Sequence, residues 1–465
     1  MTMTPVLRYL RILLIAAPLI CAAGEPPDSS LAHRDVLRRL IAAGLRDQGA
    51  FPVLKELTAK AGHRLSGSRG SAIAVQLMRD AMRARSLQHV RTERVMVPHW
   101  ERGTTEKALL ILPNGKSRNL PVCALGGSVG TPPGGITAGV LEVRSIDDPA
   151  LKREEARGKI VFFNRPMDPA LLNTFDAYGG AVDQRSKGAA AAARAGAVGA
   201  IVRSMTLALD DVPHTGAMGY AEGVKKIPAA AISTRAAEIL SRLLKGSEPL
   251  RLALTLSCRS LPDALSANVM GEITGSERPD EVIVVGGHLD SWDKGSGAHD
   301  DAAGCAQAIE AVSLLKRIGL QPKRTIRAVL FMNEENGLRG GRAYAADPGR
   351  KGERHIALIE SDRGGFAPRG FTIDADSTVL PRALRWQPLF DSLGAGHIAR
   401  GYSGVDISPM VATGVPGFGL DVENQRYFDY HHSDNDTIDK VNPRELELGA
   451  IVEALLCYLI SEEGL

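Results

Sequence analysis

The chain carries no excess of charge of either sign. Among its 465 residues, 56 are Lys or Arg and 53 are Asp or Glu, so the formal net charge is +3, and no long basic run occurs. A nucleic-acid-binding protein usually presents a basic face to the phosphate backbone, so the sequence argues against nucleic acid as a partner. Hydrophobic residues make up 44% and charged residues 23%, which is typical of a globular protein and not of a disordered chain.

Long hydrophobic runs are also missing. A membrane-spanning helix needs about 20 consecutive apolar residues, and the strongest candidate, residues 12–20, falls short of that length. Because Arg8 and Arg11 precede this run and small residues at 22–24 follow it, the pattern predicts a cleavable signal peptide over residues 1–23. We therefore expect a secreted or periplasmic protein with no membrane span after signal removal.

Cysteine is scarce, and none of it has metal-binding spacing. Cys21 lies in the predicted signal peptide, and the other four cysteines allow three disulfide pairings between which sequence cannot choose. Cys305 and Cys457 lie in helical patterns and are expected to be buried free thiols. No C-x-x-C pair occurs, so a metal site in this chain would use other ligands.

The length of the chain allows two domains, and its composition changes twice. Residues 24–119 carry helical patterns and then short strands, including a hairpin signal at Asn114-Gly115. Residues 120–261 are rich in Gly, Ala and short strands. Residues 262–465 alternate continuous Val/Ile/Leu strands with helices. Such alternation predicts an α/β fold whose mainly parallel, mixed central sheet is covered by helices on both faces.

Residues with metal-ligand chemistry follow successive strands of the last segment. They are His288, Asp300, Glu335, Asp362 and His432. Any one of them alone is weak evidence, because ordinary alternatives exist: a packed histidine, a helix cap for Asp300-Asp301, a solvated turn for Glu334-Glu335, or a surface pair for His431-His432. Open α/β sheets build their sites at the carboxyl ends of strands. Five such residues at successive strand ends therefore favour a metal site.

The charge balance of this set favours two zinc ions. Two Zn²⁺ bring +4 and the three carboxylates −3, so one bridging hydroxide would neutralise the cluster; zinc lowers the pKa of bound water to about 7. Asp300 is the candidate for the carboxylate that spans both ions. Glu334, next to a ligand, is the candidate general base. Asp290 is the candidate for orienting the His288 ring, with a plain strand-end turn residue as the alternative.

The motifs HLDS, GAHDDAAG, MNEENG, ESD and HHSDNDT resemble those of the co-catalytic two-zinc exopeptidases. The resemblance is closest to the plasma glutamate carboxypeptidase, or carboxypeptidase Q, branch, and it covers nearly the whole mature chain. It implies that one zinc takes His288, Asp300 and Asp362. The other would take Asp300, Glu335 and His432, with Asp300 bridging and Glu334 as the base.

The same resemblance implies three further features. The bond between Asp300 and Asp301 is expected to be cis, and residues 120–261 to be a β-rich protease-associated domain inserted into the peptidase domain. Single-domain aminopeptidases of this type tend to carry Tyr before the last histidine ligand, whereas this chain has His431. His431 is therefore the candidate for polarising the substrate oxyanion. His214, in the insert, is expected to be an ordinary loop histidine.

Together these expectations describe a secreted di-zinc metallo-exopeptidase that hydrolyses short unblocked peptides, dipeptides foremost, by attack of a metal-bridging hydroxide. An aminopeptidase releasing N-terminal residues from longer peptides is the main alternative. A single-zinc glutaminyl cyclase and a non-catalytic receptor-like binding module are disfavoured because no ligand is missing. The sequence leaves side-chain preference, the metal loaded in the cell and formation of a homodimer open.

Overall fold

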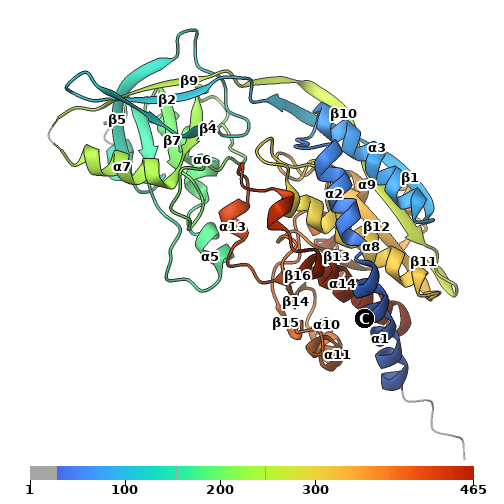
Figure 1. The fold of residues 1–465 in the computed structure, drawn as a ribbon. Coiled ribbons are helices and arrows are strands. Elements are labelled where there is room, and N and C mark those ends of the chain that lie inside the picture. The colour runs from blue at the N-terminus through green and yellow to red at the C-terminus, as the bar shows by residue number, and fades with distance from the viewer. Residues whose placement is uncertain (1–28, 153–154, 247) are drawn as a thin grey trace, which may run out of the picture.

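The chain folds into two bodies, each built on an eight-stranded sheet (Figure 1). This computed structural model describes residues 29–152, 155–246 and 248–465. The predicted signal peptide, residues 1–23, lies outside the described residues. Within the described ranges, no helix is both long enough and apolar enough to cross a membrane.

The larger body, here called the peptidase body, contains the sheet with strand order β1-β10-β12-β11-β13-β16-β14-β15. Its strands are β1 (Gln88–Glu101), β10 (Arg259–Ile273), β11 (Arg278–His288), β12 (Arg324–Phe331), β13 (Arg354–Glu360), β14 (Pro368–Asp374), β15 (His397–Arg400) and β16 (Gly417–Val422). At the centre, β11 is parallel to β12 and β13, and β13 is parallel to β16. β1, β10 and β14 pair antiparallel with neighbours, so the predicted mixed sheet is confirmed.

Helices cover both faces of this sheet because its central strands are apolar on both faces. On β11, Ile283 and Val285 join one buried cluster while Val282 and Val284 join another, as the two-residue period of a strand requires. The first cluster packs under α1 (Ser29–Asp47), α2 (Ala50–Lys60), α3 (Arg69–Ala84), α8 (Ala303–Arg317) and α14 (Pro443–Glu463). The second packs under α9 (Arg339–Ala346) and α12 (Ser408–Val411).

The smaller body, here called the insert, contains the sheet with strand order β3-β2-β9-β5-β6-β7-β8-β4. Its strands are β2 (Glu106–Ile111), β3 (Ser117–Leu120), β4 (Val122–Ala124), β5 (Ile136–Val143), β6 (Ile160–Phe163), β7 (Gly199–Arg203), β8 (Ala229–Ile232) and β9 (Arg251–Leu256). β2 and β3 form the hairpin predicted at Asn114-Gly115. By strand membership the insert runs from Glu106 to Leu256, so its first boundary precedes the predicted residue 120.

The two bodies are joined through one ribbon. The chain leaves the peptidase body after Glu101 and re-enters it at Arg259, and these two residues are paired at the end of the β1–β10 ladder. Figure 1 shows this ribbon leading from the sheet of the peptidase body toward the insert. The insert's α6 (Asp183–Arg194) packs on β7, and α7 (Thr234–Leu244) on β5.

The remaining helical segments are short. They are α4 (Pro149–Lys152), α5 (Thr174–Gly179), α10 (Val379–Leu384), α11 (Gln387–Asp391) and α13 (Tyr427–Tyr430), with single turns at η1 (Ala298–Ala302), η2 (Pro348–Arg350) and η3 (Ile438–Lys440). Two of them meet between the bodies, because the ring of Phe175 in α5 stacks on that of Tyr427 in α13 at 5.3 Å. The insert therefore rests on the loop region that follows β16 (Figure 1).

Candidate metal centre and active site

The five predicted ligand residues all lie at the carboxyl edge of the peptidase body's sheet. His288 is the last residue of β11, Asp362 lies two residues beyond β13, and Glu335 lies four residues beyond β12. Asp300 lies in η1, the turn between β11 and α8, and His432 follows α13. Parallel neighbours end at the same edge of a sheet, which is why residues far apart in the sequence meet here.

The carboxylate of Asp300 lies between the other four. Its Oδ1 is 3.1 Å from Nε2 of His288, and its Oδ2 is 3.2 Å from Nε2 of His432. On the first side, Nε2 of His288 also lies 3.4 Å from Oδ1 of Asp362. On the second side, Nε2 of His432 lies 3.1 Å from Oε2 of Glu335. Asp300 thus presents one oxygen to His288 and the other to His432, and donor atoms of His288, Asp300 and Glu335 also lie within 4.8 Å of one another.

These donor atoms fit zinc. Two ligand atoms each about 2.1 Å from a common ion, at a tetrahedral angle, lie about 3.4 Å apart, and the four separations range from 3.1 to 3.4 Å. Oδ2 of Asp300 is buried and has no hydrogen-bond partner among the described residues. A buried carboxylate oxygen without a partner is costly, and a cation at this position would remove that cost.

Asp300 and its neighbour Asp301 have different partners. Asp301 accepts the backbone N–H of His288 at 3.0 Å and that of Gly304 at 2.9 Å, so it caps the start of α8. A side chain at Gly304 would overlap the Asp301 carboxylate. The peptide bond between the two aspartates is cis, as predicted. Helix capping is therefore the role of Asp301, and Asp300 is left to face the two histidines.

Two further aspartates hold the site in place, one through its carboxylate and one through its main-chain carbonyl. Asp436 accepts the backbone N–H groups of His299 at 2.7 Å and Asp300 at 3.1 Å. Asp290 contacts the ring of His288 through its main-chain carbonyl and not through its carboxylate. Nδ1 of His288 donates to the Asp290 main-chain carbonyl at 3.0 Å, which leaves Nε2 for a metal.

The side chain of Asp290 has a function that the sequence did not reveal. Its Oδ1 lies 4.0 Å from Nδ1 of His288, beyond hydrogen-bond distance. The same oxygen accepts the backbone N–H of Asn333 at 2.7 Å and that of Glu334 at 3.0 Å. The Asp290 carboxylate therefore fixes the backbone that presents Glu334, and the carbonyl alone fixes the histidine ring.

The adjacent glutamates Glu334 and Glu335 also differ. Glu335 is buried; its Oε1 accepts the backbone N–H of Trp292 at 3.0 Å and its Oε2 faces His432. Glu334 lines the cavity over the site and has no metal-ligand partner within the described donor groups. Burial raises the pKa of Glu334 well above its usual value, and the negative charge of Asp362 adds to this. Bound cations would act in the opposite direction.

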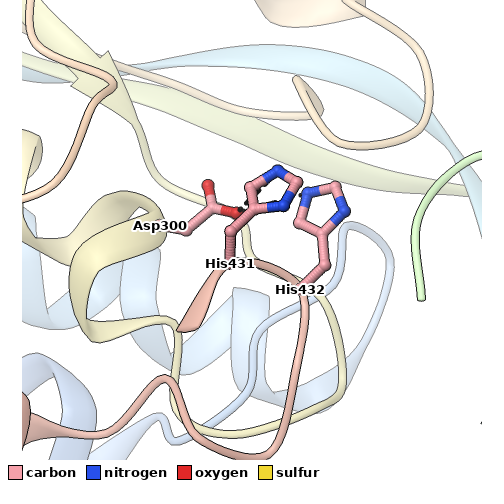
Figure 2. Close-up of side chains that lie close together, drawn as sticks. All are labelled: Asp300, His431 and His432. Atoms are coloured by element: carbon pink, nitrogen blue, oxygen red, sulfur yellow. Dashed lines mark ion pairs between the residues drawn. The ribbon is translucent and has the colours of Figure 1, made fainter. Parts of the chain in front are cut away.

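His431 lies against His432 in the same loop. The two rings stack with centroids 3.5 Å apart, and Nε2 of His431 lies 3.8 Å from Oδ2 of Asp300. Figure 2 shows both rings side by side beside that carboxylate. Burial, together with the nearby His432, lowers the pKa of His431 well below its usual value. Its ring is therefore neutral at neutral pH and can donate one N–H.

The insert also contacts this histidine loop. His214 is buried, and its Nδ1 donates to the main-chain carbonyl of His431 at 2.7 Å. The backbone N–H of Thr215 donates to the carbonyl of His432 at 2.9 Å. Burial lowers the pKa of His214 to about 4, which keeps its ring neutral. The expectation of an ordinary loop histidine is wrong, because His214 supports the loop that carries His431 and His432.

A cavity of about 340 Å³ lies over these groups. Its floor includes Asp300, Glu334, Glu335, Asp362 and His432 from the peptidase body, while Phe175, Tyr178 and Arg185 line it from the insert. This volume is near the lower end of the range for small-ligand sites, about 300–1,000 Å³. Residues of both bodies thus line a site suited to a small ligand.

Two groups of imidazole and carboxylate donors sharing one aspartate, with a further glutamate beside them, define the site of a zinc metallopeptidase. Comparison with known proteins agrees. Residues 268–456 match the family model of peptidase family M28. Carboxypeptidase Q of Bos taurus is 36% identical over 419 residues, which cover 90% of this chain and 86% of that protein. The chain belongs to peptidase family M28.

Solved structures show the same relationship. The structure of a peptidase M28 precursor from Shewanella amazonensis superposes with a TM-score of 0.89 at 34% identity, over 93% of this chain and 98% of that one. A zinc aminopeptidase from Bacillus subtilis has a TM-score of 0.62 at 20% identity, over 88% of this chain and 94% of that one. The second comparison shows that the two proteins share a fold.

Proposed function

We propose that this zinc metallopeptidase is an exopeptidase that hydrolyses short unblocked peptides, dipeptides foremost, with two zinc ions per chain. The observation that carries the proposal is the division of the Asp300 oxygens between two groups of donors. His288 and Asp362 would complete one zinc site, and Glu335 and His432 the other. The carboxypeptidase Q relatives support a substrate with a free terminus.

The zinc ions would polarise the scissile carbonyl and lower the pKa of water. The chain's own residues would do the rest. Glu334 would take a proton from the attacking water and later deliver it to the leaving amine, a role worth about 10²–10⁴ in rate. Neutral His431 would donate its N–H to the carbonyl oxygen as negative charge develops there.

The lining of the cavity by both bodies supports a preference for short substrates. Phe175, Tyr178 and Arg185 of the insert lie opposite the peptidase body's residues, so a chain extended in that direction would meet the insert. A longer peptide would have to displace these side chains, whereas a dipeptide would not. The insert would thus serve as the predicted protease-associated cover that limits substrate size.

The proposal is tested on one purified sample, before and after removal of metal by a chelator. Turnover of unblocked dipeptides, tripeptides and an amino acid p-nitroanilide is measured together with zinc content. We expect two zinc ions per chain, preferred cleavage of dipeptides, and loss of activity on chelation that zinc restores. Strong cleavage of the anilide and of longer peptides would make the protein an aminopeptidase. Bound zinc without hydrolysis of any substrate would favour a binding module.

We also propose that the protein is secreted or periplasmic, which rests on the signal peptide predicted from residues 1–23. The N-terminal sequence of the protein recovered from its native compartment tests this. We expect a mature terminus close to residue 24, in an extracytoplasmic fraction. An intact Met1 on protein recovered from the cytoplasm would contradict it.

A further inference from the structure

One side chain of the peptidase body is buried in the core of the insert. Trp292 lies in the loop between β11 and η1, four residues after the proposed ligand His288. It is only 2% exposed, and it belongs to the buried hydrophobic cluster that contains residues of β2, β5, β6, β7 and β9. The loop that begins at a proposed zinc ligand is therefore anchored in the other body.

The insert receives the Trp292 ring at a glycine. A side chain at Gly126 would overlap the outer edge of the indole ring, at Cη2 and Cζ3. The backbone of Gly126 is fixed on both sides, because its N–H donates to the carbonyl of Gly216 at 2.9 Å and its carbonyl accepts from Met218 at 3.0 Å. Its φ is outside the left-handed region, so the fit of the ring is what requires glycine here. A side chain at this position would have to displace the indole.

The same tryptophan contacts both residues that would complete the second zinc site, here the site of Glu335 and His432. Its backbone N–H donates to Oε1 of Glu335 at 3.0 Å, while Oε2 of Glu335 faces His432. Its ring meets that of His432 edge to face, with the centroids 5.8 Å apart and the planes at 67°. Partners of this kind hold metal ligands in orientation, and their loss costs about 10–100-fold in metal affinity or activity.

The next residue along the loop fastens it to the beginning of the insert. The carboxylate of Asp293 accepts Nε of the buried Arg102 at 2.9 Å. The same guanidinium donates to Oε1 of Glu106, the first residue of β2, at 3.0 Å and to Oγ1 of Thr215 at 3.2 Å. The backbone N–H of Thr215 in turn donates to the carbonyl of His432. A displacement of the insert would therefore also displace this loop.

The other proposed zinc site is held within the peptidase body. Nδ1 of His288 donates to the main-chain carbonyl of Asp290 at 3.0 Å. His288 ends β11 and Asp362 lies two residues beyond β13, and both strands are at the centre of the sheet. The contacts of Trp292 with Glu335 and His432 thus fall on one of the two sites.

We propose that Trp292 is a positioning residue that couples docking of the insert to binding of zinc at the second site. This inference rests on the proposed function, since it requires two zinc ions per chain. With the indole seated on Gly126, the loop holds the Trp292 N–H toward Glu335 and the ring against His432. Coupling between two binding events is reciprocal, so zinc at the second site should also strengthen docking of the insert.

The test displaces Trp292 from the side of the insert. Gly126→Ala adds a methyl group where the indole lies, whereas Gly219→Ala, at an exposed position of the insert with open space around it, is the matched control. Zinc is removed from the loaded protein by graded competition with a chelator. We expect Gly126→Ala to weaken one of the two zinc ions about 10-fold and the other less than about threefold, with the control like wild type. In Glu335→Gln, which lacks the second site, Gly126→Ala should not change the affinity for the remaining zinc.

Trp292→Phe provides the rescue. The smaller ring leaves room for the added methyl group, so within this background Gly126→Ala should change zinc affinity less than about threefold, a non-additive result expected of residues in contact. Hydrogen exchange of residues 214–218 measures the reciprocal effect: zinc should slow it in the wild type and less in Gly126→Ala.

Two results would overturn the coupling alone: unchanged zinc affinity in Gly126→Ala, or equal losses at both sites. A single zinc ion in the wild type would instead overturn the proposed two-zinc function, and the coupling with it.

Discussion

The peptidase body and the insert contribute different things to one cavity. All five proposed zinc ligands and the proposed base come from the peptidase body, at the ends of strands or in the turns that follow them. No described residue of the insert belongs to a cluster of metal-ligand donors. It places Tyr178, Arg185 and His214 against the loop of His431 and His432 instead. Groups that need exact geometry lie on a rigid sheet edge, while groups that would select the substrate lie on a separate body.

Replacement of Asp300 should have the largest effect, because this residue belongs to both donor groups. Even outer partners of metal ligands are worth about 10–100-fold in affinity or activity, so we expect Asp300→Asn to lose more than about 100-fold in both zinc affinity and turnover. Asp301→Ala tests the contrast with its neighbour: because it removes the acceptor of two backbone N–H groups, it should lower thermal stability, as loss of a helix cap does. Normal zinc content in Asp300→Asn would contradict the bridging role.

Glu334→Gln should separate catalysis from metal binding. Glu334 belongs to none of the metal-donor clusters found among the described residues, so we expect near-normal zinc content with turnover reduced by about 10²–10⁴. Glu335→Gln is the matched comparison, because its carboxylate faces His432, and there zinc should be lost as well. Zinc content by elemental analysis and dipeptide turnover are measured on both. Loss of zinc from Glu334→Gln would reverse the proposed roles of the two residues.

Asp290→Ala should have an intermediate effect. Removal of its carboxylate leaves the backbone N–H groups of Asn333 and Glu334 without their acceptor, while the carbonyl that orients His288 stays. We expect turnover to fall by about 10–100-fold, with zinc largely retained. If zinc were lost as completely as in Glu335→Gln, the carboxylate would be supporting the histidine ligand and not the base.

Among these variants, His214→Ala should have the smallest effect on turnover. It tests whether the insert does more than cover the cavity. The change removes one buried hydrogen bond to the His431 carbonyl, worth about 1 kcal/mol, so we expect a roughly fivefold fall in turnover. Zinc content should not change. Unaltered kinetics would mean that the insert does not support the histidine loop through His214.

Much of this molecule could be predicted from local sequence. The runs EVIVVGGHLD and TIRAVLFMNEE form β11 and β12, and the run PRELELGAIVEALLCYLI lies in α14. Continuous apolar strands and long helices carry strong local signals. Four of the five proposed ligands were predicted for the same reason, since they end or follow β11, β12 or β13 and the topology brings the ends of parallel strands to one edge, whereas His432 follows the short helix α13.

Other features depend on contacts that no local pattern reports. Arg185 and His214 lie 247 and 217 residues from their partners in the histidine loop. Arg185 stands just before the alanine-rich run of α6, where it looks like an ordinary solvated charge. The composition predicts that the insert begins at residue 120, whereas β2 and β3, which begin before that residue, already belong to its sheet. The local sequence of a hairpin does not show which sheet the hairpin will join. Which atom of Asp290 faces which partner is likewise a matter of tertiary geometry.

The zinc content of the purified, folded protein tests the central claim most directly. Elemental analysis after removal of loosely bound metal should give two zinc ions per chain in the wild type, because the peptidase body supplies all five proposed ligands. Asp300→Asn should retain less than one. A wild-type ratio of one or below would contradict the assignment of two zinc sites to this body.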